Sequence, residues 1–398
     1  MLSIKVKKKT MLIYMLFIVL LYETIAKYIG VTWESTIYSN VVSMQGKTIV
    51  TLKCIEFIIV LLLGLAYNHI ERTQISLAGC TLLLSGILWS IININSGLAL
   101  IYLDTPPVLL IELGILIMVF QDNDVRERVL SFVKILTVFF IGLTIYDLVY
   151  FLSQYRLVRM ANGNIIEHYA NALFLLAVLN SMSGTDKDRK KFIMYFAGAT
   201  LCVVSVFITS RGWMLQAILL LASMYLTTSN KSFVSKISHV ILAIIGFGII
   251  YAILSYYLND ALGYVLNRIG EDTRTSQLDD FFSQVPIWKL VLGQGPSATY
   301  YHNGGAYAYI DNIYLFWMFR YGIVPVIAYW SLFLRELFVK KSAASKQSSL
   351  PHKTMILMWL LAMGGVCIYY GIRLDIANIV LLAAVINLKK GGEKELIL

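Results

Sequence analysis

The chain has 398 residues, of which 58% are hydrophobic and 14% are charged. One soluble core cannot bury so much apolar side-chain surface, so the composition excludes a water-soluble enzyme and predicts an integral membrane protein. The formal net charge of +10 does not indicate nucleic-acid binding. Most of the lysines lie at the ends of apolar runs, where basic residues set membrane topology.

Apolar runs of membrane-crossing length predict an all-α, polytopic helix bundle of about twelve spans in a single domain, 1–398. The first run follows a lysine cluster and is too long for a cleaved signal peptide, so we expect it to be retained. Lysine-rich joints on one side place both termini in the cytoplasm and the large polar loop, 258–312, outside. The expected spans are 11–29, 49–67, 75–93, 98–120, 129–150, 169–182, 192–209, 213–228, 237–257, 313–337, 354–372 and 374–388.

The fourth span is interrupted by Asp104-Thr105-Pro106-Pro107. Prolines leave backbone carbonyls without partners, which indicates a broken helix against a cavity, although a simple kink fits equally well. Ionisable residues within the spans gather in the outer half or near the middle, which predicts a wet cavity that opens outward and is closed below. These residues are Glu23, Glu56, Asp104, Glu112, Asp147, Arg320 and Asp375.

Arginines are unexpectedly frequent on the predicted outer side, where lysines are scarce. A guanidinium group pairs with two phosphate oxygens at once, so this pattern predicts a site for a fixed anion. Anchoring to lipid headgroups or pairing with nearby carboxylates is the alternative. Ser210-Arg211-Gly212 joins two short runs, where Ser210 can cap the next helix beside Arg211, or the three residues can form a plain hairpin. The outer arginines are Arg156, Arg159, Arg211, Arg268, Arg274, Arg320 and Arg373.

The large loop contains three predicted features. Residues 279–292 fit an amphipathic helix at the membrane interface, and Gly293-Gln294-Gly295-Pro296 predicts a turn. The tyrosine-rich run 300–309 offers aromatic faces to sugar rings, or is an ordinary interfacial belt. Candidate glycan contacts are Tyr301, His302 and Asn312. The histidines and the four cysteines have no metal-ligand spacing, so no metal site is predicted.

Asp311 lies at the membrane surface ahead of the tenth span. In that position a carboxylate can accept a hydroxyl proton, balance nearby arginines or cap the following helix.

The second half of the chain resembles the O-antigen polymerase and O-antigen ligase superfamily across roughly residues 195–330. Elsewhere the similarity rests on hydropathy alone. The segments that carry it are Thr209-Ser210-Arg211-Gly212, Arg274 ahead of Leu292-Gly293-Gln294-Gly295, Asp311-Asn312-Ile313-Tyr314-Leu315, and Tyr321-Gly322-Ile323.

The resemblance implies a bacterial inner-membrane glycosyltransferase. Arg211 and Arg274 would hold the diphosphate of a polyprenyl-linked sugar donor. Beyond the resemblance, Arg320 or Arg373 on the predicted outer side could assist them. Asp311 would be the base for the acceptor hydroxyl. The ligases carry His where this chain has Asp311, which favours a polymerase. No arginine here has glycine eleven positions later, so the Arg-x10-Gly loop signature of some polymerases is absent.

These features predict a polymerase that joins undecaprenyl-diphosphate-linked oligosaccharide repeat units on the outer face of the bacterial cytoplasmic membrane, without metal or cofactor. Expected partners are membrane lipids and, in the same pathway, flippase and chain-length regulator proteins. One alternative is a ligase that transfers finished glycan to a different acceptor. Another is a flippase or transporter, which would require polar residues in the inner halves of the spans and two related halves; the sequence has neither.

Overall fold

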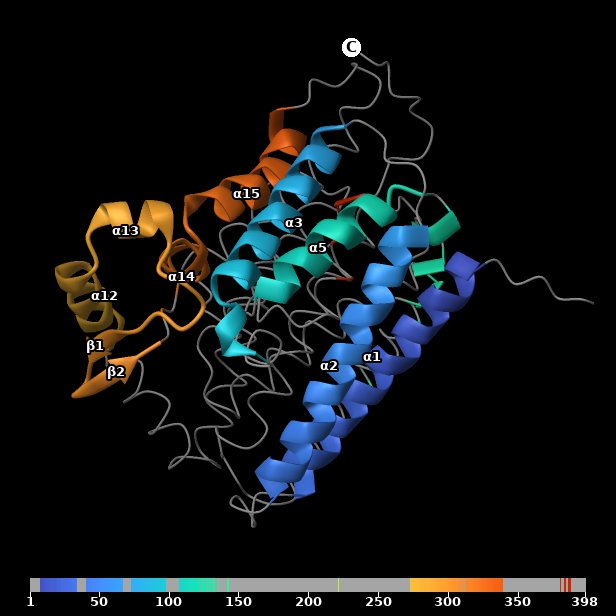
Figure 1. Ribbon diagram of the computed structural model, residues 1–398, viewed down its shortest axis with the longest axis horizontal. Coiled ribbons are helices and arrows are strands. Elements are labelled where there is room, and N and C mark those ends of the chain that lie inside the picture. The colour runs from blue at the N-terminus through green and yellow to red at the C-terminus, as the bar shows by residue number, and fades with distance from the viewer. Residues whose placement is uncertain are drawn as a thin grey trace, which may run out of the picture.

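The computed structural model describes residues 8–33, 41–66, 73–97, 107–122, 124–126, 128–129, 131–132, 135, 142, 221, 273–308, 310, 312–338, 380, 383 and 386–387. They are mostly helical, with one short β-hairpin (Figure 1). The elements are α1 (Lys8–Trp33), α2 (Val41–Ala66), α3 (Gln74–Ile92), the short 3-10 turn η1 (Ile94–Ser96), α5 (Pro107–Val119), α12 (Thr273–Gln284), α13 (Ile287–Leu292), β1 (Tyr300–His302), β2 (Gly305–Tyr307), α14 (Ile313–Tyr321) and α15 (Ile323–Phe338).

The first three helices overlap the first three predicted spans, although α2 begins at Val41 rather than at residue 49 and α1 extends beyond 11–29 at both ends. Within the fourth, α5 begins at Pro107, the helix position where a missing amide hydrogen costs nothing. Asp104, Thr105 and Pro106 lie outside the described residues, as do almost all of the spans predicted between 142 and 273 and between 338 and 380. The twelve-span bundle therefore stays a prediction.

Helices α3 and α5 pack with their backbones in contact. A Cβ atom added to Gly114 would lie 2.5 Å from the Gly79 carbonyl oxygen, and one added to Gly86 would lie 2.7 Å from the Pro107 carbonyl oxygen. Small residues at a helix crossing allow this approach and are typical of helix pairs in membranes. The later residue on α3, Gly86, meets the earlier residue on α5, Pro107, so the two helices are antiparallel.

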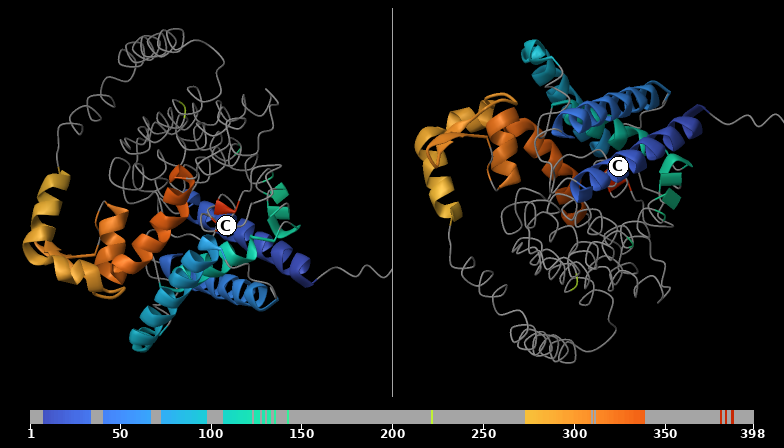
Figure 2. Two further views of the ribbon diagram at one scale, coloured as in Figure 1. Left: turned by 90° about the horizontal axis from the view of Figure 1, so that it is seen from above. Right: turned by 90° about the horizontal axis from the view of Figure 1, so that it is seen from below.

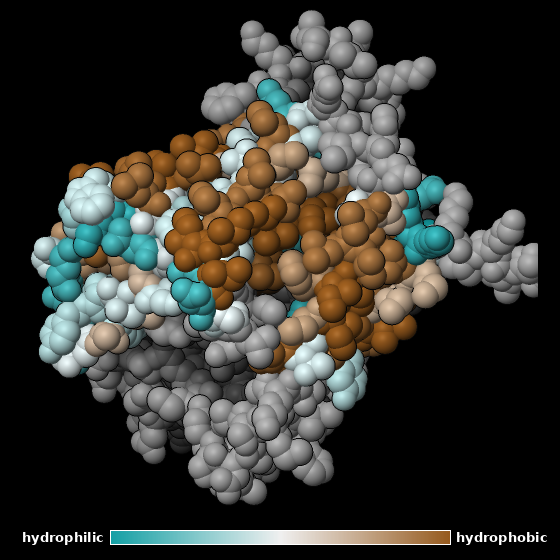
Figure 3. All heavy atoms as spheres, viewed as in Figure 1, coloured by the Kyte–Doolittle hydropathy of each residue, from teal (hydrophilic) through white to brown (hydrophobic). Residues whose placement is uncertain are grey.

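The opposite face of α3 carries large apolar side chains that are exposed. Leu77, Leu84, Leu88 and Ile91 follow helical spacing and are each more than half exposed. Figure 3 shows this hydrophobic surface across α2, α3 and α15, with hydrophilic residues at its left and right margins. Among the described residues, α3 is the one helix that is long and apolar enough to cross a bilayer by length and composition; α5 and Ile323–Leu332 are shorter apolar helices.

Polar residues hold together the end of the bundle where α1 begins. The Lys9 ammonium lies 3.7 Å from an Asp122 carboxylate oxygen, the Gln121 amide donates to the Ser76 hydroxyl, and Arg126 donates to the Asn387 carbonyl. The segment α12 to β2 lies on the opposite side of the molecule in Figures 1 and 2. The contacts of Lys9 and Arg126 and the segment α12 to β2 therefore lie on opposite sides of the described part of the chain, and the predicted membrane topology stays a prediction.

Two predicted helices are interrupted. Residues 279–292 do not form one helix, because α12 ends at Gln284 and α13 begins only after Pro286. The proline ring disfavours the helical conformation of the preceding residue, Val285. Residues 313–337 are not continuous either. Gly322 has φ 81° and ψ −179°, which ends α14 before α15 begins.

The β-hairpin was not predicted. Tyr300 pairs with Tyr307 and His302 with Gly305, which leaves Asn303-Gly304 as a two-residue turn. Both turn residues have positive φ, 49° and 84°. Asn-Gly is the preferred sequence for such a turn, so the signal was present in the sequence.

Candidate functional site

The Gly293-Gln294-Gly295 turn packs against the C-terminal end of α14. The amides of Gln294 and Gly295 donate to the carbonyls of Phe319 and Arg320, at 2.8 and 2.9 Å. Helix ends leave their last carbonyls without intrahelical partners, and this turn supplies two of the missing donors. These two amides are engaged by the protein itself, so the turn is a backbone clamp on α14, and its glycines cradle no phosphate.

Trp89 supplies a third donor from the far end of α3. Its indole nitrogen donates to the Tyr321 carbonyl at 3.0 Å, although the two residues are 232 positions apart. The Gly322 amide donates to the Met318 carbonyl at 3.0 Å, so each carbonyl from 318 to 321 accepts a hydrogen bond. The end of α3 and the glycine turn therefore fix the same helix terminus.

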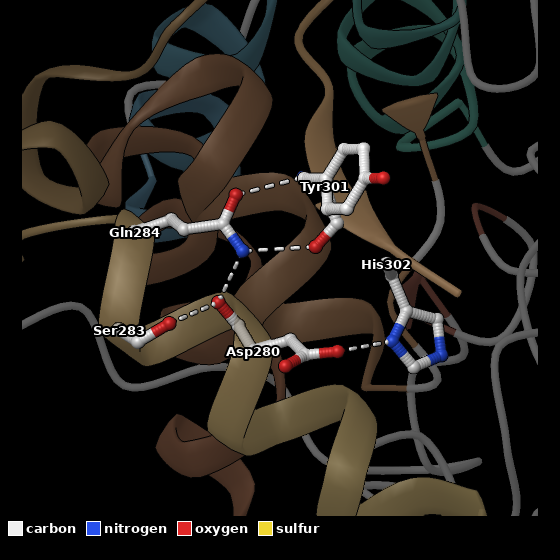
Figure 4. A network of polar contacts seen from close by, with 5 residues as sticks. All are labelled: Asp280, Ser283, Gln284, Tyr301 and His302. Carbon is white, nitrogen blue, oxygen red and sulfur yellow. Dashed lines mark hydrogen bonds and ion pairs between the residues drawn. The ribbon is translucent and has the colours of Figure 1, made fainter. Parts of the chain in front are cut away.

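The hairpin is attached to α12 by two polar side chains (Figure 4). The Gln284 amide accepts from the Tyr301 backbone N–H and donates to the Tyr301 carbonyl, both at 2.8 Å. One carboxylate oxygen of Asp280 lies 2.7 Å from Nδ1 of His302. Gln284 thus acts like an added strand residue, and Asp280 fixes the orientation of the imidazole ring.

Aromatic rings join α12, the hairpin and α14 into one small core. Phe281 is fully buried, and its ring centroid lies 5.2 Å from those of both Tyr300 and Phe319, in edge-to-face geometry. Such pairs stabilise beyond the area they bury, by about 0.5–1.5 kcal/mol. We call the segment 273–322, which contains α12, α13, the hairpin, the glycine turn and α14, the loop unit.

Arg320 lies in the last turn of α14 and is 3% exposed. Its guanidinium group donates to the Ala308 carbonyl at 3.3 Å and lies 4.3 Å from the centroid of the Phe316 ring. A cation near a helix C-terminus is favoured by the helix dipole, and the ring face adds a cation–π contact. In the described structure Arg320 therefore contacts the Ala308 carbonyl and a ring of its own helix. Its role at a diphosphate stays a prediction.

The three candidate glycan contacts differ in accessibility. The side chain of Asn312 accepts from the backbone amides of Tyr314 and Leu315, at 3.0 and 3.2 Å, and so caps α14. Tyr301 is 61% exposed, whereas His302 is 6% exposed. Of these side chains, Tyr301 presents the most surface to a ligand.

The remaining candidates are not placed. Arg211, Asp311 and Arg373 lie outside the described residues, and for Arg274 the structure describes only the backbone, in the first turn of α12. The proposed pairing of Arg211 with Arg274 therefore stays a prediction. Within the described part of the chain, no three His, Cys, Asp or Glu side chains are grouped so that they could hold a metal ion.

Sequence reasoning did not identify Asp280 and Gln284 as contacts within the loop unit, or Trp89 of α3 as a contact to it. Trp89 has no signal in the sequence, because its partner is a distant backbone carbonyl. Asp280 and Gln284 are four residues apart and therefore lie on one face of α12, which was a usable signal once the Asn-Gly turn was recognised.

Comparison of the chain with protein-family models, with curated proteins and with solved structures gives no match.

Proposed function

We propose that the chain is a membrane glycosyltransferase that polymerises oligosaccharide repeat units carried on undecaprenyl diphosphate, at the outer face of a bacterial cytoplasmic membrane. The observation that carries the proposal is the clamp between the glycine turn and α14. It brings together two segments of the proposed superfamily pattern, Gly293-Gln294-Gly295 and Tyr321-Gly322-Ile323.

The loop unit supports the proposal because it joins the helix that carries Arg274 to the helix that Asn312 caps. The hairpin is hydrogen-bonded to α12 through Gln284, and its Tyr300 ring packs against Phe319 of α14. The exposed apolar surface of α3 supports a membrane location. An enzyme acting on a lipid-linked donor needs such a polar unit beside an apolar belt.

In the proposed reaction, a hydroxyl oxygen of one repeat unit attacks the anomeric carbon of the growing glycan on its lipid carrier. The bond between that carbon and the diphosphate oxygen breaks, and its electron pair leaves with the lipid diphosphate. The hydroxyl proton passes to the Asp311 carboxylate. Arg211 and Arg274 stabilise the negative charge that develops on the diphosphate, so the chemistry calls for no metal or cofactor.

The direct test incubates the purified chain with its lipid-linked repeat unit in the presence of EDTA. A ladder of products that differ by one repeat unit supports a polymerase, and transfer of finished glycan to a second acceptor without a ladder supports a ligase. In a deletion strain, single repeat units indicate a lost polymerase and long lipid-linked chains a lost ligase.

Arg211→Lys and Arg274→Lys test the diphosphate role. Each should abolish most polymer formation while membrane insertion is kept, because an ammonium group cannot pair with two phosphate oxygens. Arg72→Lys, in a joint on the predicted cytoplasmic side, is the matched control and should retain activity. Near-normal polymer from either test variant would remove the diphosphate role.

A further inference from the structure

The short helix α13 exposes apolar side chains within an otherwise polar loop. Ile287 is 76% exposed, Leu292 is 66% exposed and Trp288 is 58% exposed, whereas Leu290 is 3% exposed and packs inward. In water these side chains would be exposed at a substantial hydrophobic cost. Exposed apolar patches of this kind mark contact with a partner or with lipid.

The position of α13 favours lipid over a protein partner. The helix contacts both α14 and α15, and the exposed side chains of Val324 and Ile327 follow on α15. In Figure 3 the hydrophobic surface over α15 continues to the upper left, where α13 lies. The patch on α13 is therefore an extension of the apolar surface of the helices.

Charge and residue type agree with an interfacial location. The Lys289 ammonium lies 5.7 Å from the centroid of the Trp288 ring, a combination of aromatic ring and basic head that is favoured where acyl chains meet headgroups. The preceding helix α12 exposes mainly polar side chains, among them Thr275, Ser276 and Asp279, with Phe282 near its C-terminal end as a half-exposed apolar exception. Along the loop unit, the surface thus changes from polar to apolar between α12 and α13.

We infer that α13 is inserted into the outer leaflet of the bilayer, with Ile287, Trp288 and Leu292 in contact with lipid. The Gly293-Gln294-Gly295 turn, which follows directly, is then held at the level of the headgroups, where the diphosphate of a lipid-linked donor lies. The choice of leaflet rests on the proposed function.

The test measures lipid contact at three positions in the full chain, reconstituted in phospholipid nanodiscs. Cys54, Cys80, Cys202 and Cys367 are replaced by alanine, and a single cysteine carrying an environment-sensitive fluorophore is placed by Leu292→Cys, Leu84→Cys or Tyr301→Cys. Leu84, on the exposed apolar face of α3, is the control for the bilayer. Tyr301, 61% exposed on the hairpin of the same loop unit, is the control for water.

Brominated lipids should quench the emission by about half at positions 84 and 292 and leave position 301 unchanged. Quenching at 84 without quenching at 292 would overturn the insertion of α13 while leaving the membrane protein intact. No quenching at 84 would overturn the membrane location on which the proposed function depends. Equal quenching at 292 and 301 would overturn the inference too, because the hairpin would then be as deep as α13.

A second measurement keeps the native cysteines, in case their removal impairs folding. A photoreactive amino acid at position 288 should crosslink to acyl chains, and the same group at position 301 should not. Crosslinking at neither position would contradict the inference.

Discussion

Gly293 and Gly322 lie backbone against backbone, each with a conformation that L side chains rarely adopt. Their φ angles are 84° and 81°, and a Cβ atom on Gly293 would lie 2.6 Å from the Gly322 amide nitrogen. A Cβ atom on Gly322 would lie 2.6 Å from the Val291 carbonyl oxygen. Neither glycine can be replaced without separating the turn from α14.

We therefore expect Gly322→Ala to destabilise the loop unit by about 2–4 kcal/mol, from conformational strain together with the backbone clash. Gly304→Ala is the matched control, because Gly304 also has φ 84° but faces open space. It should cost only the conformational part, roughly 1–2 kcal/mol. Thermal unfolding of the purified chain measures both; equal losses would show that the close approach contributes nothing.

Trp89→Phe should weaken the attachment of α3 to α14. The variant keeps an aromatic ring near Tyr321 but loses the 3.0 Å hydrogen bond to its carbonyl, a net loss of about 0.5–1.5 kcal/mol. Hydrogen exchange of the amides around Gly322 should accelerate. Trp288→Phe, at an exposed position, is the comparison and should leave exchange there unchanged; the same acceleration in both variants would argue against a specific role for the indole.

Gln284→Ala should release the hairpin from α12. It removes both hydrogen bonds to the Tyr301 backbone and leaves these groups to water, with an expected loss of about 1–2 kcal/mol locally. Limited proteolysis near Asn303 reports the change. In Gln294→Ala the lost side chain donates a hydrogen bond to the Gly293 carbonyl and makes none to the hairpin among the described residues, so cleavage should not increase; unchanged cleavage in Gln284→Ala would refute the attachment.

Asn312→Ala should shorten or fray α14, because two amides lose their cap, at a cost of about 0.5–2 kcal/mol. Asn312→Ser restores a capping oxygen and should recover stability. Polymer formation by the serine variant then separates two roles for this residue. Normal activity means that Asn312 acts as a cap, whereas a stable but inactive variant means that its amide also contacts the glycan.

Much of the local structure could be predicted from neighbouring residues. Apolar runs gave the positions of α1, α2 and α3, and the two prolines at 106–107 marked the region where α5 begins. The break after Gln284 and the Asn-Gly hairpin had equally local causes but were missed, because hydropathy and aromatic content were weighed above turn chemistry. The interruption at Gly322 was hidden by the apolar residues on both sides of it.

By itself the sequence predicted a mostly apolar, helical chain, indicated where several of the described helices lie, and determined which residue types are available for an anion. Only the tertiary structure decided that the backbones of Gly293 and Gly322 are in contact, that the Trp89 indole donates a hydrogen bond to the Tyr321 carbonyl, and that the Gln284 side chain hydrogen-bonds to the hairpin at Tyr301. The reason is physical: helix periodicity and capping depend on residues a few positions apart, whereas these contacts join backbone groups whose meeting depends on the whole path of the chain.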